Sequence, residues 1–203
     1  MKTHRQLAFL LTLLGWVYGH VHAAESKPNL LLILADDLGY GDVRCYNAEA
    51  KVPTPHLDRL AREGMRFTDA HAPATVCTPT RYSLMTGQMA FRVPGGGTVF
   101  TGVGGPSLIA PGRLTLPAML RQQGYATAAV GKWHIGFTFR DKAGEPIHKG
   151  GLEDVRRVDF SRRIEGGPVD HGFDRFFGTA CCPTTDWLYA FIENDREIGR
   201  AHV

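Results

Sequence analysis

The chain has 203 residues, of which 43% are hydrophobic and 21% are charged, with 24 glycines and 12 prolines. This composition is typical of one globular domain and excludes a disordered or fibrous chain. The formal net charge is +3, and omitting Lys2 and Arg5 leaves 21 basic against 20 acidic side chains. This balance does not favour nucleic-acid or membrane binding, so local charge would have to hold an anionic ligand.

Residues 1–23 have the pattern of a secretory signal peptide. A basic start precedes the apolar run 7–18, and small residues allow cleavage after Ala23. The apolar run is shorter than the ~20 residues that a membrane-spanning helix needs. We therefore expect a cleaved signal, a mature domain over residues 24–203, a secreted or periplasmic location and no stable membrane anchor.

A buried strand is predicted over residues 30–35, a continuous apolar run whose length suits a strand covered on both faces. It ends in Asp36 and Asp37, and ligand sites in α/β sheets lie at the carboxyl ends of such strands. Two adjacent carboxylates there can bind a hard cation such as Ca²⁺, which takes several oxygen ligands. Alternatively, both aspartates cap backbone N–H groups in a turn.

A helix and a strand are predicted next. Thr54 and Pro55 have the pattern of a helix start, and Gly64 ends this helix. Residues 65–71 then predict a strand with Met65 on one of its faces.

The pentapeptide C-T-P-T-R at residues 77–81 is the most informative pattern in the chain. A helix is predicted over residues 79–86, which puts the Cys77 thiol at a helix N-terminus. Free backbone N–H groups and the helix dipole favour an anion there. Arg81 lies one turn further on and can reach the same anion.

Two other interpretations of Cys77 stay open at this point. The first is a plain thiolate nucleophile, favoured by the helix N-terminus and by Arg81, with His71 or His134 as its partner in a Cys–His hydrolase. The second is a small buried thiol beside an exposed arginine.

Loop, helix and strand follow in that order. Residues 92–113 contain seven glycines and three prolines and predict a flexible surface insertion. Thr115 caps a predicted helix that Gly124 ends, and residues 125–130 predict a second buried strand.

Lys132 and His134 stand two residues apart just after this strand, within G-K-W-H-I-G. The lysine can hold an anionic substrate as a point charge, and the imidazole can act as an acid or base near neutral pH. The alternative is a surface lysine and a hydrogen-bonded structural histidine.

The remaining sequence divides into two parts. Residues 138–168 are polar and charged, and little regular structure is predicted there. Residues 171–178 return to packed, aromatic sequence. Because strands alternate with helices, the predicted class is α/β with a mostly parallel central sheet flanked by helices.

Four cysteines complete the set of candidate reactive residues. An exported protein meets an oxidising compartment, so a bridge from Cys45 to Cys181 or Cys182 is allowed. Cys181 and Cys182 are adjacent, and such neighbours rarely bridge each other. The sequence leaves the pairing open.

Together, and in this order, the motifs resemble the sulfatase family. They are the strand-end Asp-Asp, C-T-P-T-R followed by L-M-T-G, and G-K-W-H-I-G. The strings P-T-P-H-L-D-R-L at residues 53–60, G-M-R-F at 64–67 and H-G-F-D at 171–174 are also similar to the family's pattern. The resemblance runs from about Asn29 to the last residues.

The resemblance implies an alkaline-phosphatase-like fold that hydrolyses sulfate esters with one Ca²⁺. Asp36 and Asp37 would be calcium ligands. Cys77, oxidised by the formylglycine-generating enzyme, would be the nucleophile and a further metal ligand.

The same resemblance assigns roles to three other side chains. Arg81 would orient the formylglycine, and Lys132 would hold the sulfate. His134 would hydrogen-bond the formylglycine hydroxyl and assist breakdown of the intermediate. The substrate would be a sulfated small molecule or a glycan.

The sequence departs from the family in one respect. The family's downstream Asp-Asn calcium pair, a further lysine and a further histidine have no counterpart here, so the chain resembles the N-terminal part of a sulfatase. Two alternatives follow: a phosphonate or phosphodiester hydrolase of the same superfamily, or an inactive truncated fragment.

Overall fold

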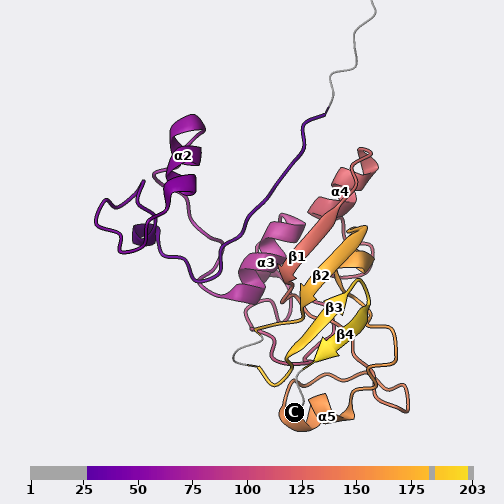
Figure 1. The fold of residues 1–203 in the computed structure, drawn as a ribbon. Coiled ribbons are helices and arrows are strands. Elements are labelled where there is room, and N and C mark those ends of the chain that lie inside the picture. The colour runs from indigo at the N-terminus through magenta and orange to yellow at the C-terminus, as the bar shows by residue number, and fades with distance from the viewer. Residues whose placement is uncertain (1–26, 183–185, 201–203) are drawn as a thin grey trace, which may run out of the picture. The chain divides into compact units, whose positions relative to one another are not determined.

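The computed structural model describes residues 27–182 and 186–200, and the predicted signal peptide lies outside these ranges. The chain divides into two compact units, Met1–Pro53 and Thr54–Val203, and each is described by itself (Figure 1). None of the helices in the described ranges is long and apolar enough to cross a bilayer.

In the described part of the first unit, regular structure is limited to the 3-10 helix η1 (Tyr40–Asp42). The backbone N–H of Gly39 donates to the Asp42 carboxylate at 2.9 Å and closes this turn. Residues 30–35 form no strand, and Leu31 is 86% exposed. The prediction of a buried strand is therefore wrong for this structure. An apolar run becomes a strand only where a neighbour pairs with its backbone, and nothing in the sequence of the run supplies one.

The second unit begins with α2 (Pro55–Glu63), which confirms the predicted helix. The N–H of Gly64 donates to the Leu60 carbonyl and ends it. The strand predicted over 65–71 does not form, and Met65 is 79% exposed. As with the first apolar run, hydrophobic alternation alone does not provide a paired neighbour.

Two further predicted helices are confirmed. α3 (Cys77–Thr86) begins two residues before the predicted start, and a short 3-10 helix, η2 (Ala90–Arg92), follows it. The Ser83 hydroxyl accepts from the Ala90 N–H at 3.1 Å and joins the two. α4 (Leu116–Gln122) is capped by the Thr115 hydroxyl, as predicted.

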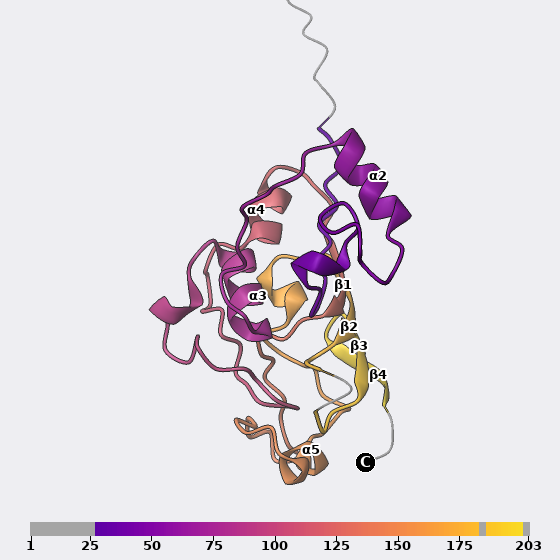
Figure 2. The same cartoon turned by 90° about the vertical axis from the view of Figure 1, so that its left-hand side faces the viewer.

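The described part of the second unit contains a mixed four-stranded sheet, with strands in the order β1-β2-β3-β4. Its strands are β1 (Ala128–Lys132), β2 (Arg175–Thr179), β3 (Ala190–Glu193) and β4 (Arg196–Arg200). β1 and β2 are parallel, and the other two pairs are antiparallel. α3 and α4 lie on one side of the sheet (Figure 2). The predicted α/β class is confirmed, but the described sheet is mixed and not mostly parallel, because short connections join β2 to β3 and β3 to β4 and such connections favour antiparallel pairs.

β1 differs from the prediction in position and in burial. It forms over Ala128–Lys132 instead of 125–130, and it lies at the edge of the sheet with Val130 83% exposed. An edge strand covered incompletely on its faces has the same apolar sequence as a central one, so the sequence could not distinguish them.

The long connection from β1 to β2 forms much of the core, against the prediction of little structure over 138–168. It contains α5 (Leu152–Arg157), and η3 (Pro168–His171) follows. Phe137, Phe139 and Ile147 are all at most 3% exposed. These three apolar side chains all point into the core. Because they are sparse among charged residues, the sequence shows no clear helical or strand period there.

The predicted loop 92–113 is confirmed apart from Arg92, which ends η2, but it is not a surface insertion. Val103 and Ile109 are fully buried. Gly150 lies so close to this loop that a Cβ there would be 1.7 Å from the Thr101 carbonyl oxygen. Glycine thus permits backbone to pack against backbone here. The high glycine content, which predicted a flexible loop, instead allows close packing.

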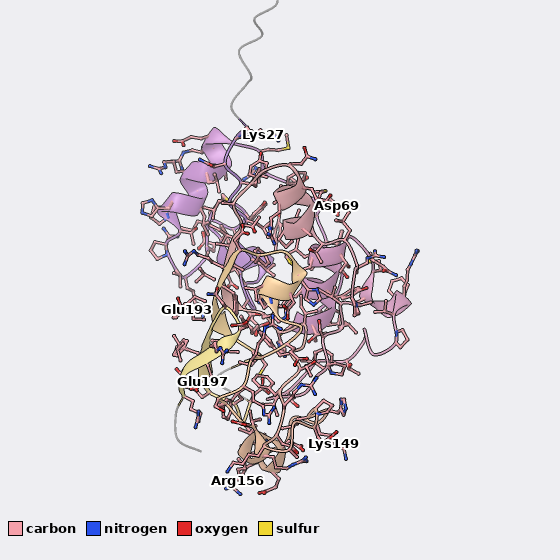
Figure 3. All side chains as sticks on the ribbon, turned by 90° about the vertical axis from the view of Figure 1, so that its right-hand side faces the viewer. Lys27, Asp69, Lys149, Arg156, Glu193 and Glu197 are labelled. Carbon is pink, nitrogen blue, oxygen red and sulfur yellow. The ribbon has the colours of Figure 1, made fainter. Side chains whose placement is uncertain are left out.

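Charged side chains cover the outside of the second unit. Figure 3 shows Lys149, Arg156, Glu193 and Glu197 there. Arg156 pairs with Glu153 at 2.7 Å, with both side chains more than half exposed. Such pairs contribute little to stability, so the buried apolar cluster holds the unit together.

We expect Phe137→Ala to lower the free energy of unfolding by about 3–5 kcal/mol, because it leaves a cavity in that cluster. Phe137 is 1% exposed and contacts Phe139 and Phe176. Phe91→Ala is the matched control, since Phe91 is 74% exposed, and its cost should be below about 0.5 kcal/mol. Urea unfolding measures both, and equal costs would contradict this description of the core.

Candidate active site

Cys77 is the first residue of α3, and Val76 before it has the extended backbone of an N-cap. The Thr80 hydroxyl donates to the Ala74 carbonyl at 2.8 Å and fixes the bend that leads into the helix. The backbone N–H groups of the first turn therefore point toward the Cys77 side of the helix end, which is the end that favours an anion.

The end of β1 meets this helix start. Lys132 Nζ lies 3.2 Å from Cys77 Sγ, and Arg81 Nη1 donates to the Lys132 carbonyl at 2.5 Å. Arg81 thus ties α3 to the end of β1, which holds the lysine ammonium beside the thiol.

His134 is 1% exposed and has a left-handed backbone with φ of 56°. The backbone N–H of His134 donates to the Ala180 carbonyl at 2.9 Å, and the ring atom Nε2 lies 2.6 Å from the Phe100 carbonyl oxygen. A carbonyl can only accept, so Nε2 must carry the proton. Nδ1 is then the ring atom with an available lone pair.

Burial is the main cause that lowers the pKa of His134, because it disfavours the charged imidazolium. The Phe100 carbonyl and the Asp186 carboxylate oppose this shift, while the positive charges of Lys132 and Arg81 add to it. The net effect keeps the ring neutral near neutral pH, as a proton acceptor requires.

Cys182 completes the cluster, and sequence reasoning did not select it as a site residue. Its Sγ lies 3.3 Å from Lys132 Nζ and 3.9 Å from His134 Nδ1. Its backbone N–H donates to the Asp186 carboxylate at 2.9 Å. Its position depends on the β1–β2 register, which places Lys132 opposite Thr179, three residues before Cys182, and no local sequence signal gives this register.

Cys181 differs from its neighbour. It is 2% exposed and donates its thiol to the Gly102 carbonyl at 3.3 Å. Burial raises the pKa of this thiol strongly, so it is a packing residue. Cys181 and Cys182 are both thiols in the structure, and a bridge from either to Cys45, which belongs to the first unit, stays a prediction.

The structure therefore brings together four of the predicted site residues: Cys77, Arg81, Lys132 and His134. Asp36 and Asp37 belong to the first unit, where both are exposed, so their role as metal ligands stays a prediction.

His71, the alternative partner for the thiol, lies elsewhere. Its exposed ring contacts the Asp69 carboxylate at 2.6 Å. His134, whose ring nitrogen lies within 4.8 Å of Cys77 Sγ, is the histidine beside the thiol.

The H-G-F-D motif supports the site from a distance. The Asp174 carboxylate accepts from the backbone N–H of Thr127 at 2.8 Å, and the Thr127 hydroxyl donates to the Gly172 carbonyl at 2.9 Å. These bonds fix the residue that precedes β1, and so fix the strand that delivers Lys132.

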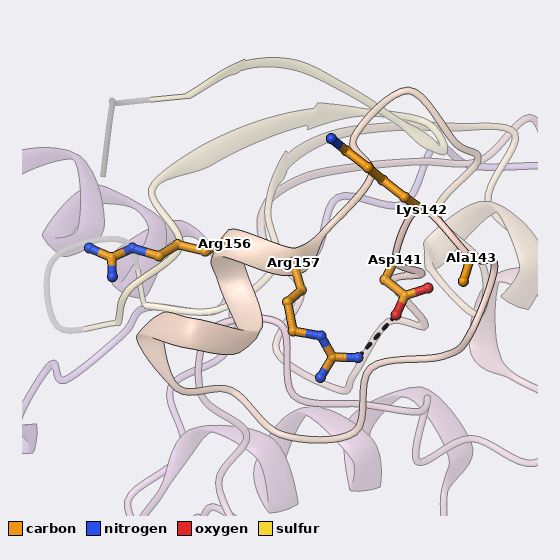
Figure 4. A pocket seen from close by; sticks show the side chains of 5 residues that line it. All are labelled: Asp141, Lys142, Ala143, Arg156 and Arg157. Atoms are coloured by element: carbon orange, nitrogen blue, oxygen red, sulfur yellow. Dashed lines mark hydrogen bonds and ion pairs between the residues drawn. The ribbon is translucent and has the colours of Figure 1, made fainter.

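A separate surface hollow of about 320 Å³ lies between α5 and the loop 141–143 (Figure 4). Arg157 there donates to the Asp141 carboxylate at 3.0 Å. Lys142 and Arg156 also line this hollow, which contains neither a thiol nor an imidazole. The cluster around Cys77 combines a thiol, an ammonium and an imidazole and is therefore the candidate active site.

Comparison with known proteins identifies the family. The sulfatase family model matches residues 28–193. The chain belongs to the sulfatase family. It is 40% identical over 169 residues to the steryl-sulfatase of Mus musculus, covering 80% of this chain and 23% of that protein.

This chain is also similar to a bacterial sulfatase and to a solved structure. The chain is 39% identical over 185 residues to an N-acetylgalactosamine-6-O-sulfatase of Bacteroides thetaiotaomicron, covering 86% of this chain and 30% of that protein. A solved structure concerned with the metabolism of multiple glycosaminoglycans by B. thetaiotaomicron superposes with a TM-score of 0.70 at 36% identity. The superposed region covers 85% of this chain and 32% of the chain in that solved structure. This sulfatase chain thus spans about a quarter to a third of these relatives.

The ring of His134 should titrate below the ordinary histidine pKa of about 6.5, because burial favours its neutral form. Since the folded-state pKa is lowered, this histidine costs stability as pH falls below about 6.5. Histidine ring NMR gives the midpoint, with His134→Gln to assign the signal. A midpoint at or above 6.5 would contradict the burial and tautomer described here.

Proposed function

We propose that this chain provides the nucleophile of a sulfuric ester hydrolase, with Cys77 converted to formylglycine. The observation that carries the proposal is the convergence of Cys77, Lys132 and His134 at the start of α3 in a chain of the sulfatase family. Hydrated formylglycine carries two hydroxyls on one carbon, one to attack sulfur as the alcohol leaves and one to expel sulfate.

Lys132 holds the sulfate group. Its ammonium lies 3.2 Å from Cys77 Sγ, so an oxyanion at the nucleophile would contact it directly. The first-turn N–H groups of α3 add partial positive charge on the same side. Fixed charges of this kind stabilise the negative charge that develops in a transition state, because the charges themselves need not reorganise.

His134 accepts the proton. With Nε2 committed to the Phe100 carbonyl, Nδ1 is the basic atom facing the cluster. A neutral, buried imidazole can take a proton from a formylglycine hydroxyl and release it later. Phe100 therefore sets the tautomer, although it contacts no reacting atom.

Arg81 positions Lys132 and His134. Its bond to the Lys132 carbonyl fixes β1 against α3. Its charge also contributes to keeping His134 neutral. We propose that it orients the nucleophile through this scaffold.

The donor types fit one Ca²⁺. Asp36 and Asp37 are exposed carboxylates, and Ca²⁺ prefers oxygen ligands. A thiol sulfur suits Ca²⁺ poorly, whereas the oxygen of formylglycine at residue 77 suits it well. Bound calcium would neutralise charge on the sulfate oxygens.

The natural setting follows from the same proposal. The signal pattern at residues 1–23 would export the chain to a secreted or periplasmic location, after the formylglycine-generating enzyme has acted. The substrate would be a sulfated small molecule or glycan. Among the relatives, one is named for a steryl sulfate and another for N-acetylgalactosamine 6-O-sulfate.

Turnover of an aryl sulfate should fall at least about 10³-fold in Cys77→Ala and in Cys77→Ser, because neither can form the two-hydroxyl nucleophile. Chelation should abolish the wild-type activity, and Ca²⁺ should restore it. Cys45→Ser is the matched control and should retain activity. The assay uses chain made together with the formylglycine-generating enzyme.

An aryl phosphodiester with the same leaving group separates the alternatives. Preference for the phosphodiester would favour the phosphonate or phosphodiester hydrolase. Substantial aryl-sulfate turnover by either Cys77 variant would contradict the formylglycine mechanism, and absence of all turnover would favour the inactive fragment.

A further inference from the structure

Two sulfurs and one ring nitrogen meet at the candidate active site. The ligand atoms of Cys77, His134 and Cys182 all lie within 4.8 Å of one another. His134 is buried, and both cysteines are half-buried. Thiolates and imidazole are the donors that Zn²⁺ and similar soft cations prefer, whereas Ca²⁺ prefers oxygen.

The spacing is close to that of a tetrahedral zinc site. With Zn–S bonds of about 2.3 Å, two sulfurs of one site lie about 3.8 Å apart. A sulfur and a ring nitrogen of one site lie about 3.5 Å apart, so the cluster needs to contract by at most about 1.3 Å. Cys182 lies beyond the last residue of β2, outside the β1–β2 register, so rotation of its side chain disturbs no strand pairing.

The ring of His134 is already oriented as a ligand. A metal-binding histidine commonly donates its second ring N–H to a backbone carbonyl, which fixes the tautomer. Nε2 of His134 makes that bond to Phe100 and leaves Nδ1 3.9 Å from Cys182 Sγ. The Asp186 carboxylate similarly anchors the Cys182 backbone.

Lys132 contacts both sulfurs, at 3.2 and 3.3 Å. An ammonium there can donate hydrogen bonds to metal-bound thiolates. Its long side chain can move aside while keeping one such bond.

We propose that the chain with Cys77 as a thiol binds one soft divalent cation, Zn²⁺, through Cys77 Sγ, Cys182 Sγ and His134 Nδ1. Each thiol releases a proton as its Zn–S bond forms, and no electron is transferred. The fourth position stays open to water. This site goes beyond sulfate ester hydrolysis and does not depend on it, because it belongs to the unconverted chain.

Conversion of Cys77 would remove one of the three donors. The zinc site and the formylglycine would therefore be mutually exclusive states of residue 77. A zinc ion there would also cover the Cys77 thiol against oxidation and alkylation.

The test uses the full chain, reduced with a phosphine and made without the formylglycine-generating enzyme. Co²⁺ is the spectroscopic probe, because cobalt–thiolate bonds give charge-transfer absorption, and Zn²⁺ is then added in competition with a chromogenic chelator. We expect one equivalent of Co²⁺, displaced by Zn²⁺. Cys182→Ser and His134→Gln should each weaken Zn²⁺ binding at least about 10-fold, and Cys45→Ser should not.

A second measurement needs no variant. Zn²⁺ should slow alkylation of Cys77 and Cys182 in the wild-type chain, read by peptide mass. Absence of the charge-transfer band, equal Zn²⁺ affinity in Cys182→Ser and the wild type, or no protection of these two thiols would each overturn the proposal.

Discussion

The parallel pairing of β1 with β2 is the constraint on which the site depends. Its register places Lys132 opposite Thr179, so the residues that leave both strands emerge at one edge of the sheet. His134 then donates its backbone N–H to the Ala180 carbonyl, which continues the pairing past the strand ends. A lysine, a histidine and a cysteine distant in sequence thereby face one another, as is general for carboxyl ends of parallel strands.

Phe100, in the loop 92–113, then connects the start of α3 to this edge. The Phe100 N–H donates to the hydroxyl of Thr78, one residue after Cys77, while the Phe100 carbonyl accepts from His134. The same peptide segment therefore links the start of α3 to the imidazole. The arrangement explains why a loop without regular structure is nevertheless buried, and how His134 keeps its proton on Nε2.

Much of this could be predicted from the sequence. Helix caps and strand-end motifs selected α3, Cys77, Arg81, Lys132 and His134, because caps and apolar runs are local signals. Cys182 and Phe100 were missed, since one contributes through register and the other through its backbone. The apolar run 30–35 failed for the converse reason: it predicts a strand, but a strand forms only with a partner, which lies outside the run itself.

The central claim is that Cys77 is the precursor of the nucleophile, and the mass of the tryptic peptide 67–81 tests it most directly. The chain is made in a host that contains the formylglycine-generating enzyme. The account predicts a peptide with an aldehyde in place of the Cys77 thiol. A peptide that carries only the unmodified thiol would contradict it, and would leave the cluster as a thiol–imidazole site of different chemistry.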